Sequence, residues 1–208
     1  MNYPEEIITV DNFSEFSTKE KDSSFIGQVY HCETEKDVNE TLTSVKKKYY
    51  DATHHCYAYR LLDQKFKYSD DGEPSGSAGL RILNAIDQFK LFNVIVIVIR
   101  YYGGTKLGVG SLGKAYYNSA LKVLENAERI SKTLYKQIFF ESSFDNVSHI
   151  HKAISNHQAI IVSSDYSEKA IFECWIKPAY LNGIKSKLTD VSKGRIKVFV
   201  KEDLYYYK

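Results

Sequence analysis

The chain has 208 residues, of which 43% are hydrophobic and 26% are charged. These proportions are ordinary for a globular protein and supply enough apolar side chains for one large domain or two small ones. The longest aliphatic run covers residues 94–99, which is far too short to cross a membrane. The three cysteines form no CxxC pair, which argues against a zinc site or a disulfide framework. We therefore expect a cytoplasmic protein without metal, cofactor or membrane partner.

The net charge of +2 favours no particular partner, but the charge is unevenly distributed along the chain. Residues 1–131 contain 16 Lys and Arg against 18 Asp and Glu, a balance of −2. Residues 132–208 contain 12 against 8, a balance of +4. Such a mildly basic C-terminal part is compatible with a nucleic-acid or ribosome surface, although an ordinary solvated surface is the simpler explanation.

Hydrophobic periodicity predicts alternating strands and helices in the first half of the chain. Thr34 is well placed to cap a helix whose apolar residues recur at spacings of four and three. The predicted elements up to residue 92 are strands over 24–31, 54–61 and 66–68, a helix over 34–48 and a helix that begins after Pro74.

A second group of elements surrounds the run from Asn93 to Arg100, which has no polar alternation along its length. Such a run is typical of a strand buried on both faces. We expect a loop over residues 101–110, followed by a helix that Ser111 caps and that ends near Glu128.

From residue 132 onward the pattern restarts as a smaller unit. Its predicted order is βαββαβ, the ferredoxin-like arrangement. The predicted elements are strands over 134–141, 158–163, 169–177 and 195–200, with helices over 146–156 and 179–191. The sequence therefore predicts an α+β protein with two domains, residues 1–131 and 132–208, while the aromatic tail LYYYK is left without an assignment.

Eight of the eleven glycines lie between Gly72 and Gly113, among clustered charges of both signs. Glycine is used where the backbone bends sharply or approaches another group closely, so this segment is the candidate binding site. The stretch 108–113 matches GxGxxG, but the preceding strand ends too early for a dinucleotide fold. A more general hypothesis is an anion site, in which free backbone amides meet the start of a helix.

Basic side chains near these glycines could complete such an anion site, although the glycines could also serve only to make a tight loop. The residues predicted to bind an anion or nucleic acid are Arg100, Gly103, Gly104, Lys106, Gly108, Gly110 and Lys114. The residues predicted to order the loops or to meet a partner are His54, Asp70, Asp71, Glu73, Ser75, Gly76, Tyr101 and Tyr116.

The carboxylates of Asp70, Asp71 and Glu73 admit three interpretations: an acidic turn, a hard-cation site, or a clamp for Arg100 or a nearby lysine. A nucleophilic Cys56 with a histidine base is a further alternative, and a buried structural thiol is the simpler one.

Three motifs in order, DATHHCYAYRL, DDGEPSGSAGLRIL and NVIVIVIRYYGGTKLGVGSLGKAYYNSA, resemble the YigZ/IMPACT family over roughly residues 20–128. The resemblance implies an N-terminal domain with a ribosomal-protein-like α/β fold, as in domain IV of elongation factor G. It also implies a C-terminal domain similar to domain V of that factor. This chain has Lys114 where the family has arginine, which keeps the charge but loses the bidentate fork.

The same resemblance implies a role linked to translation, because the eukaryotic branch regulates the amino-acid-starvation response by binding a kinase activator. We expect a non-enzymatic regulatory protein that binds RNA, the ribosome or a translation regulator through the glycine-rich face of its N-terminal domain. The alternatives are an enzyme acting on a phosphorylated or peptide-like small molecule at that face, and a pure protein-interaction module.

Overall fold

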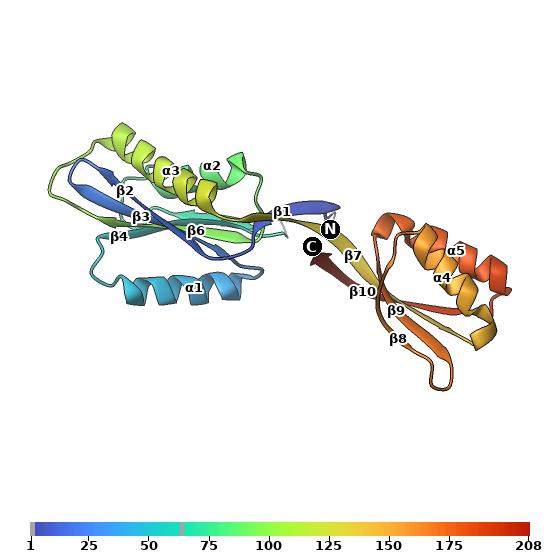
Figure 1. Ribbon diagram of the computed structural model, residues 1–208. Helices are drawn as coiled ribbons and strands as arrows, with labels where there is room; N and C mark the ends of the chain where they lie inside the picture. Colours follow the sequence, from blue (N-terminus) through green and yellow to red (C-terminus); the bar gives the residue numbers. More distant parts are fainter. Residues whose placement is uncertain (1–2, 63–64) are drawn as a thin grey trace. The chain divides into compact units, whose positions relative to one another are not determined.

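A computed structural model describes residues 3–62 and 65–208 of the chain (Figure 1). The fold is α+β, and its described strands form two five-stranded sheets. The chain divides into two compact units, of which one contains residues 7–131 with Tyr3 and the other contains residues 4–6 and 132–208. No helix in the described part of the chain combines the length and the hydropathy that a membrane crossing requires.

The first unit is a sheet covered by helices on both faces (Figure 1). Its sheet has the order β2-β3-β6-β4-β5, and each neighbouring pair is antiparallel. Helix α1 packs on one face, whereas α2 and α3 pack on the other. The elements are β2 (Ser14–Glu20), β3 (Ser23–His31), α1 (Glu35–Lys48), β4 (His54–Arg60), β5 (Phe66–Ser69), α2 (Gly79–Gln88), β6 (Val94–Tyr101) and α3 (Val109–Asn126).

Strand β6 is the centre of this unit, and its side chains alternate between two cores. The valines at 94, 96 and 98 join the core beneath α2 and α3, whereas the isoleucines at 95, 97 and 99 join the core beneath α1. All six side chains are fully buried. The prediction of a strand buried on both faces is therefore confirmed.

The helix starts show where local sequence signals were sufficient and where they were not. Thr34 caps α1 as predicted, in a capping box with Asp37. Helix α3 instead begins at Val109, after Gly108 with a φ of +74°, so the prediction that Ser111 caps it is wrong. Gly108 provides the left-handed conformation that brings the chain into the helix, and Ser111 lies inside the first turn. Helix α3 ends at Asn126, two residues before the expected end, because Ala127 is already extended.

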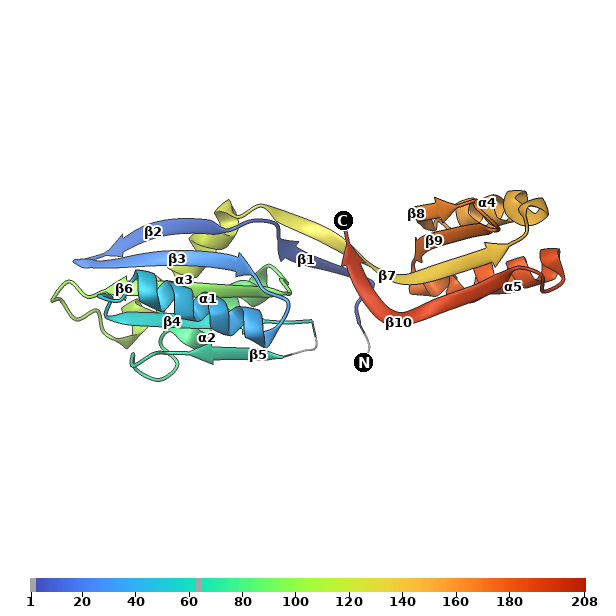
Figure 2. The same cartoon turned by 90° about the horizontal axis from the view of Figure 1, so that it is seen from below.

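The second unit has the order βαββαβ, and both of its long helices lie on one side of its sheet (Figures 1 and 2). Strand β7 pairs with β9 and β10, and β9 pairs with β8, all antiparallel. The buried residues between this sheet and the helices form a single core. The elements are β7 (Arg129–Ser142), α4 (Val147–Asn156), β8 (Ile160–Asp165), β9 (Ala170–Ile176), α5 (Leu181–Ser192) and β10 (Lys197–Tyr207), with short 3₁₀ turns η1 (Phe144–Asn146) and η2 (Pro178–Tyr180).

Two features of the sheets have no counterpart among the sequence predictions. Strands β1 (Glu6–Val10) and β2 were not expected, and the edge strand β2 is partly to fully exposed along its length, so hydrophobic alternation is weak there. The aromatic tail is the end of β10, which pairs with β7 as far as Tyr207 after a shift of register between Val200 and Leu204.

The close approach of backbone at Gly79 gives a test of this packing. A Cβ at Gly79 would lie 2.7 Å from backbone atoms of Ser69, whereas a Cβ at Gly110 would meet nothing within 4 Å. We expect Gly79→Ala to lower the free energy of unfolding by about 1–3 kcal/mol through overpacking. Gly110→Ala, the matched control in the first turn of α3, should leave that free energy unchanged or raise it by up to about 1 kcal/mol. Urea unfolding followed by circular dichroism measures both, and equal effects would contradict the close packing of Gly79 against Ser69.

Candidate functional site

The two glycine-rich loops of the first unit meet at a buried carboxylate. Glu73 Oε1 accepts hydrogen bonds from Arg100 Nη1 at 2.6 Å and from the Tyr116 hydroxyl at 2.7 Å. The side chains of Glu73 and Arg100 are only 5% and 6% exposed. One carboxylate thus joins the loop after β5, the end of β6 and helix α3.

Arg100 lies in the interior, which changes the role that the sequence suggested for it. Its Nη2 donates to Ser23 Oγ at 3.2 Å, and its guanidinium packs against the rings of Phe25 and Tyr102 at 5.4 and 5.3 Å. With its charge paired to Glu73, Arg100 is not open to a phosphate. Of the interpretations that the sequence left open, the acid clamp matches this geometry.

His54 lies at the edge of the same cluster. Its Nδ1 lies 2.8 Å from the carbonyl oxygen of Asp71, and since a carbonyl can only accept, Nδ1 carries the proton. The other ring nitrogen, Nε2, lies 3.8 Å from Glu73 Oε2. The imidazole is 20% exposed, so it closes one side of the buried carboxylate and still reaches solvent.

Asp70 and Asp71 order the first loop by accepting hydrogen bonds from backbone amides. Asp70 accepts from Gly76, Ala78 and Gly79 at 2.8–2.9 Å, so it caps the start of α2 from outside the helix. Asp71 accepts from the His55 amide at 2.7 Å and from Lys46 Nζ at 3.2 Å.

These contacts also set the ionisation of Asp71. Burial of the Asp71 carboxyl raises its pKa, but the hydrogen bonds from the His55 amide and Lys46 outweigh burial and hold the pKa below its ordinary value. Because the three acidic side chains of this loop turn to different partners, they do not converge on a common point. The described residues contain no cluster of His, Cys, Asp and Glu side chains arranged to share a metal ion.

The thiol of Cys56 is buried beneath this loop and donates to the carbonyl oxygen of Asp70 at 3.0 Å. Burial raises the pKa of Cys56 well above its usual range, and the nearby carboxylates raise it further. Burial also raises the pKa of the Tyr116 hydroxyl. Cys56 is therefore held as a thiol, which is the form of a structural cysteine rather than of a nucleophile.

The outer surface of the loops is open backbone with lysines. A Cβ at Gly76, Gly104, Gly108 or Gly110 would meet no atom within 4 Å, and Gly76, Gly104 and Gly108 have positive φ angles. Lys106 and Lys114 are exposed. Among the described residues, no side chain caps the start of α3.

The remaining predicted residues lie in different surroundings. Ser75 is exposed at the turn before α2. Tyr101 packs with the core beneath α1 and its hydroxyl donates to Asp51 at 2.8 Å, so it lies away from Arg100. Burial and the Asp51 carboxylate raise the pKa of Tyr101 to about 12.

Gly103 belongs to the site for a steric reason. A Cβ at Gly103 would come within 1.9 Å of the backbone oxygen of Asp22. Sequence reasoning missed Asp22 and Ser23, whose contacts fix the second loop: Thr105 donates to Asp22 at 2.6 Å, and Ser23 Oγ accepts from Arg100. No residue pattern marks them, because their partners lie about 80 positions away in the sequence.

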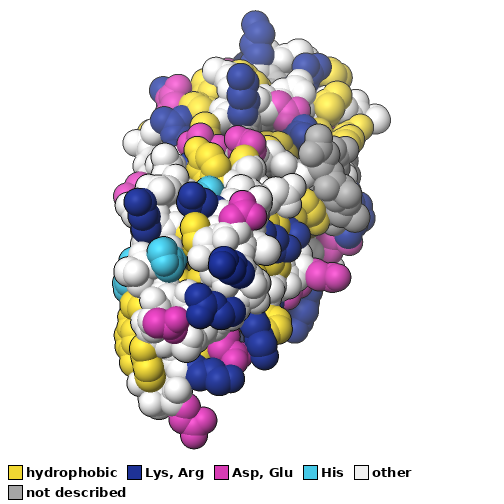
Figure 3. Space-filling view, turned by 90° about the vertical axis from the view of Figure 1, so that its right-hand side faces the viewer, with side chains coloured by type: hydrophobic (Ala, Val, Ile, Leu, Met, Phe, Trp, Pro, Cys, Tyr) yellow, Lys and Arg dark blue, Asp and Glu magenta, His cyan; other side chains and the backbone are white. Residues whose placement is uncertain are grey.

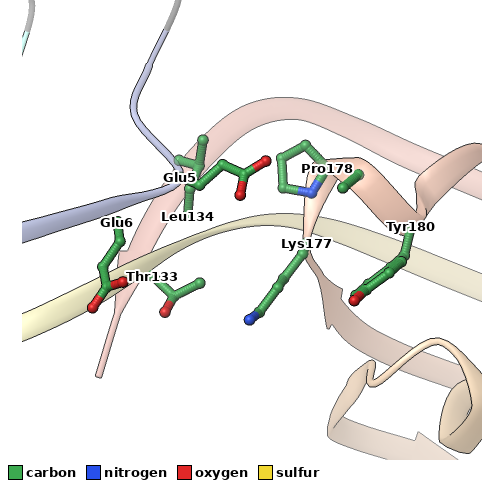
Figure 4. Close-up of a pocket in the computed structure, with 8 residues that line it drawn as sticks. Glu5, Glu6, Thr133, Leu134, Lys177, Pro178 and Tyr180 are labelled. Atoms are coloured by element: carbon green, nitrogen blue, oxygen red, sulfur yellow. The ribbon is translucent and has the colours of Figure 1, made fainter.

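A pocket of about 170 Å³ in the second unit is separate from these loops (Figure 4). It contains none of the residues that the sequence singled out. Lys177 and Tyr180 approach it from one side of the view and the Glu5 and Glu6 carboxylates from the other. Its lining residues are Glu5, Glu6, Thr133, Leu134, Lys177, Pro178, Ala179 and Tyr180.

Comparison with known proteins gives matches over most of the chain. The Impact N-terminal domain family matches residues 21–124. The chain is 29% identical to IMPACT family member YvyE of Bacillus subtilis over 189 residues, which cover 90% of this chain and 87% of the relative. It is 30% identical to an IMPACT family member of Haemophilus influenzae over 188 residues, 87% of this chain and 90% of the relative.

Two further matches are a eukaryotic protein that covers part of the chain and a solved structure that covers nearly all of it. Protein IMPACT of Danio rerio is 35% identical over 99 residues, 44% of this chain and 31% of that protein. A crystal structure of a hypothetical protein superposes with a TM-score of 0.67 at 26% identity, covering 96% of this chain and 100% of the other.

The buried ion pair gives the first test of the site. We expect Glu73→Gln to lower the free energy of unfolding by about 3–5 kcal/mol, because it leaves the Arg100 charge buried without a counter-charge. Tyr116→Phe should cost about 1.5–3 kcal/mol, since it removes one hydrogen bond to a charged group. Tyr117→Phe, at the partly exposed neighbouring tyrosine, is the control and should cost less than about 0.5 kcal/mol. Urea denaturation measures all three, and a Glu73→Gln variant as stable as Tyr117→Phe would exclude the ion pair.

The depressed pKa of Asp71 gives a test by pH. A carboxyl whose pKa is lower in the folded state stabilises the protein above its unfolded pKa of about 3.9. That contribution is lost as the pH falls through the folded value. We expect Asp71→Asn to be less stable than the parent at pH 7, and the difference to shrink as the pH falls below about 4. Unfolding free energies at several pH values would show this, and a difference independent of pH would contradict it.

Proposed function

Because the chain belongs to the IMPACT family, we propose that it is a translation-linked regulatory protein whose first unit docks on RNA, as such or within the ribosome. The docking surface is the glycine-rich face, formed by residues 70–79 and 100–114. The local match to eukaryotic IMPACT proteins supports the regulatory role. The same match makes a translation-regulatory protein the other candidate partner of the glycine-rich face.

The observation that carries this proposal is the contrast between the inside and the outside of the face. Inside, Glu73, Arg100 and Tyr116 form a buried network that holds both loops. Outside, Gly104 and Gly108 leave backbone open to solvent, and Lys106 and Lys114 are exposed beside it. A fixed backbone with free space above it suits close contact with another chain.

Phosphate groups fit the chemistry of that outer surface. The uncapped start of α3 presents backbone amides and the positive end of the helix dipole, which favour an anion. Lys106 and Lys114 would add point charges on either side of that helix start. In this proposal Arg100 acts through Glu73 as a positioning residue, and it does not contact the phosphate.

The geometry favours docking over catalysis at the same face. The best-placed general base, Glu73, is buried and already bound by Arg100 and Tyr116. Cys56 is held as a thiol. The space around Gly104 is open, whereas small-molecule sites are concave and bury most of their ligand.

The two units would correspond to the domains that the family resemblance implies. The first would have the ribosomal-protein-like fold found in domain IV of elongation factor G. The strand pairing of the second, in the order β10-β7-β9-β8, supports a ferredoxin-like domain. Fold likeness of this kind is compatible with a translation-linked role and does not by itself identify the partner.

The salt dependence of RNA binding tests the proposal. The Lys106→Ala, Lys114→Ala double variant should bind ribosomal RNA more weakly than the parent. Its plot of log affinity against log salt should be flatter by about 1.4, because each phosphate of a single strand that a lysine no longer neutralises removes about 0.7 from the slope. Filter binding over a series of salt concentrations measures the slope.

A matched control removes the same number of positive charges from the opposite face of the sheet, where α1 lies. Lys36→Ala, Lys47→Ala on α1 removes two exposed lysines and should leave the slope unchanged. Equal slopes for the parent and the Lys106, Lys114 variant would refute the phosphate contact. Affinity capture from a lysate tests the protein partner. If the Lys106, Lys114 variant loses a protein that the parent captures and still binds RNA as the parent does, the protein partner is favoured instead.

A further inference from the structure

The sheet of the second unit has one face that its own helices leave uncovered. Helices α4 and α5 both lie on one side of the sheet, and alternate strand residues fill the core between them (Figures 1 and 2). On β9, for example, Phe172 and Cys174 point into that core. Because side chains alternate along a strand, Glu173 and Trp175 belong to the other face.

That open face carries several aromatic rings. Phe139 on β7 is directly opposite Phe199 on β10, and Phe199 is 52% exposed. Trp175 on β9 stacks on Tyr205 with parallel rings 6.2 Å apart, and it meets Tyr207 edge to face at 4.5 Å. The rings come from three different strands, so the aromatic character belongs to the face as a whole rather than to one exposed side chain.

Cations and hydrogen-bonding groups are interleaved with these rings. Lys201 Nζ lies 5.5 Å from the centre of the Phe139 ring, and Lys197 lies on the same face two positions before Phe199. Gln137 and Glu173 hydrogen bond to each other between Phe139 and Trp175. A dry protein interface would be depleted in such charged groups at its centre.

We propose that this open face is a second binding surface, and that its occupant is single-stranded nucleic acid whose unpaired bases stack on the rings. Aromatic rings on a sheet accept bases of any sequence, because every base has a π-face, while nearby lysines attract the phosphates. The +4 balance of residues 132–208 is complementary to a phosphate backbone. From the right-hand side of Figure 1, the surface has basic and acidic side chains mixed (Figure 3).

The proposal differs in chemistry from the docking at the glycine-rich face. There, backbone amides and lysines would hold phosphates without reading bases. Here, ring faces would hold the bases themselves, so the two surfaces respond to different substitutions and to different ligands.

Trp175 is the only tryptophan of the chain, so its fluorescence reports on this face directly. We expect a single-stranded oligouridylate to quench Trp175 fluorescence with saturation. An abasic oligomer of the same length keeps the phosphates and lacks the bases, and it should quench far less. Quenching of equal strength by both oligomers, or no quenching by either, would overturn the proposal.

Two variants separate stacking from apolar docking. Phe199→Leu keeps an apolar side chain but removes the ring, and it should weaken oligouridylate binding roughly 5- to 150-fold. Phe144→Ala removes an exposed ring on η1, outside the open face, and should leave the affinity unchanged. Parental affinity in Phe199→Leu would favour a protein partner and overturn the proposal, and Tyr207→Leu repeats the test should Phe199→Leu fail to fold.

The Lys106→Ala, Lys114→Ala variant separates this surface from the glycine-rich face. It should keep the Trp175 quenching by oligouridylate even where its binding of ribosomal RNA is reduced. Loss of quenching in that variant would place the bound oligomer at the glycine-rich face and would overturn the second surface alone.

Discussion

The arrangement of the candidate site depends on the buried ion pair between Glu73 and Arg100. The two charges lie in separate segments, one in the loop before α2 and one near the end of the central strand β6. Removing charges from water is costly, and their mutual attraction offsets that cost only when their other hydrogen-bonding groups are satisfied as well. Tyr116 and Ser23 supply two of those partners, so α3 and the start of β3 are held to the same pair, while Arg100 Nε is buried without a hydrogen-bond partner in the described part of the chain.

The acidic side chains of the first loop have hydrogen-bond or ion-pair partners within the fold, and this determines which charges the outer surface exposes. Asp70 turns inward to cap α2, and Asp71 turns to the His55 amide and Lys46. The acidic residues most able to repel an anion are therefore paired, while Lys106 and Lys114 remain on the outside. A motif with charges of both signs in the sequence thus becomes a surface on which Lys106 and Lys114 are exposed, while the acidic side chains of the first loop have partners within the fold.

Local patterns were sufficient wherever a residue's environment is set by its neighbours in the chain. The apolar run of β6 and the cap that Thr34 provides to α1 are of this kind, and both appear in the structure as expected. Partners far apart in sequence could not be predicted in this way. Arg100 follows an apolar run and precedes two tyrosines. An acid clamp for it was one of three interpretations of the acidic loop, and the sequence could not single out Glu73, 27 positions earlier, as its partner. For related reasons, the predicted cap of α3 is wrong and the sequence leaves the tail that ends β10 without an assignment. A serine is a good cap, but a glycine in the left-handed conformation directs the chain into the helix three residues earlier. The tail contains three consecutive tyrosines, whose identity as a strand depends on the long partner β7 and on the register shift after Val200.

The two proposed surfaces follow from a difference in how the two sheets are covered. The first sheet has helices on both faces, so it can present only its loops, where glycine and lysine bring backbone and charge to a partner. The second sheet has helices on one face, so its strands themselves are available, and aromatic residues at alternate positions give that face its chemistry. A loop surface of this kind suits the regular phosphate backbone, whereas a flat aromatic face suits bases that are already unstacked. A folded RNA with both paired and single-stranded parts would match both surfaces, which is the kind of ligand that a translation-linked role would require.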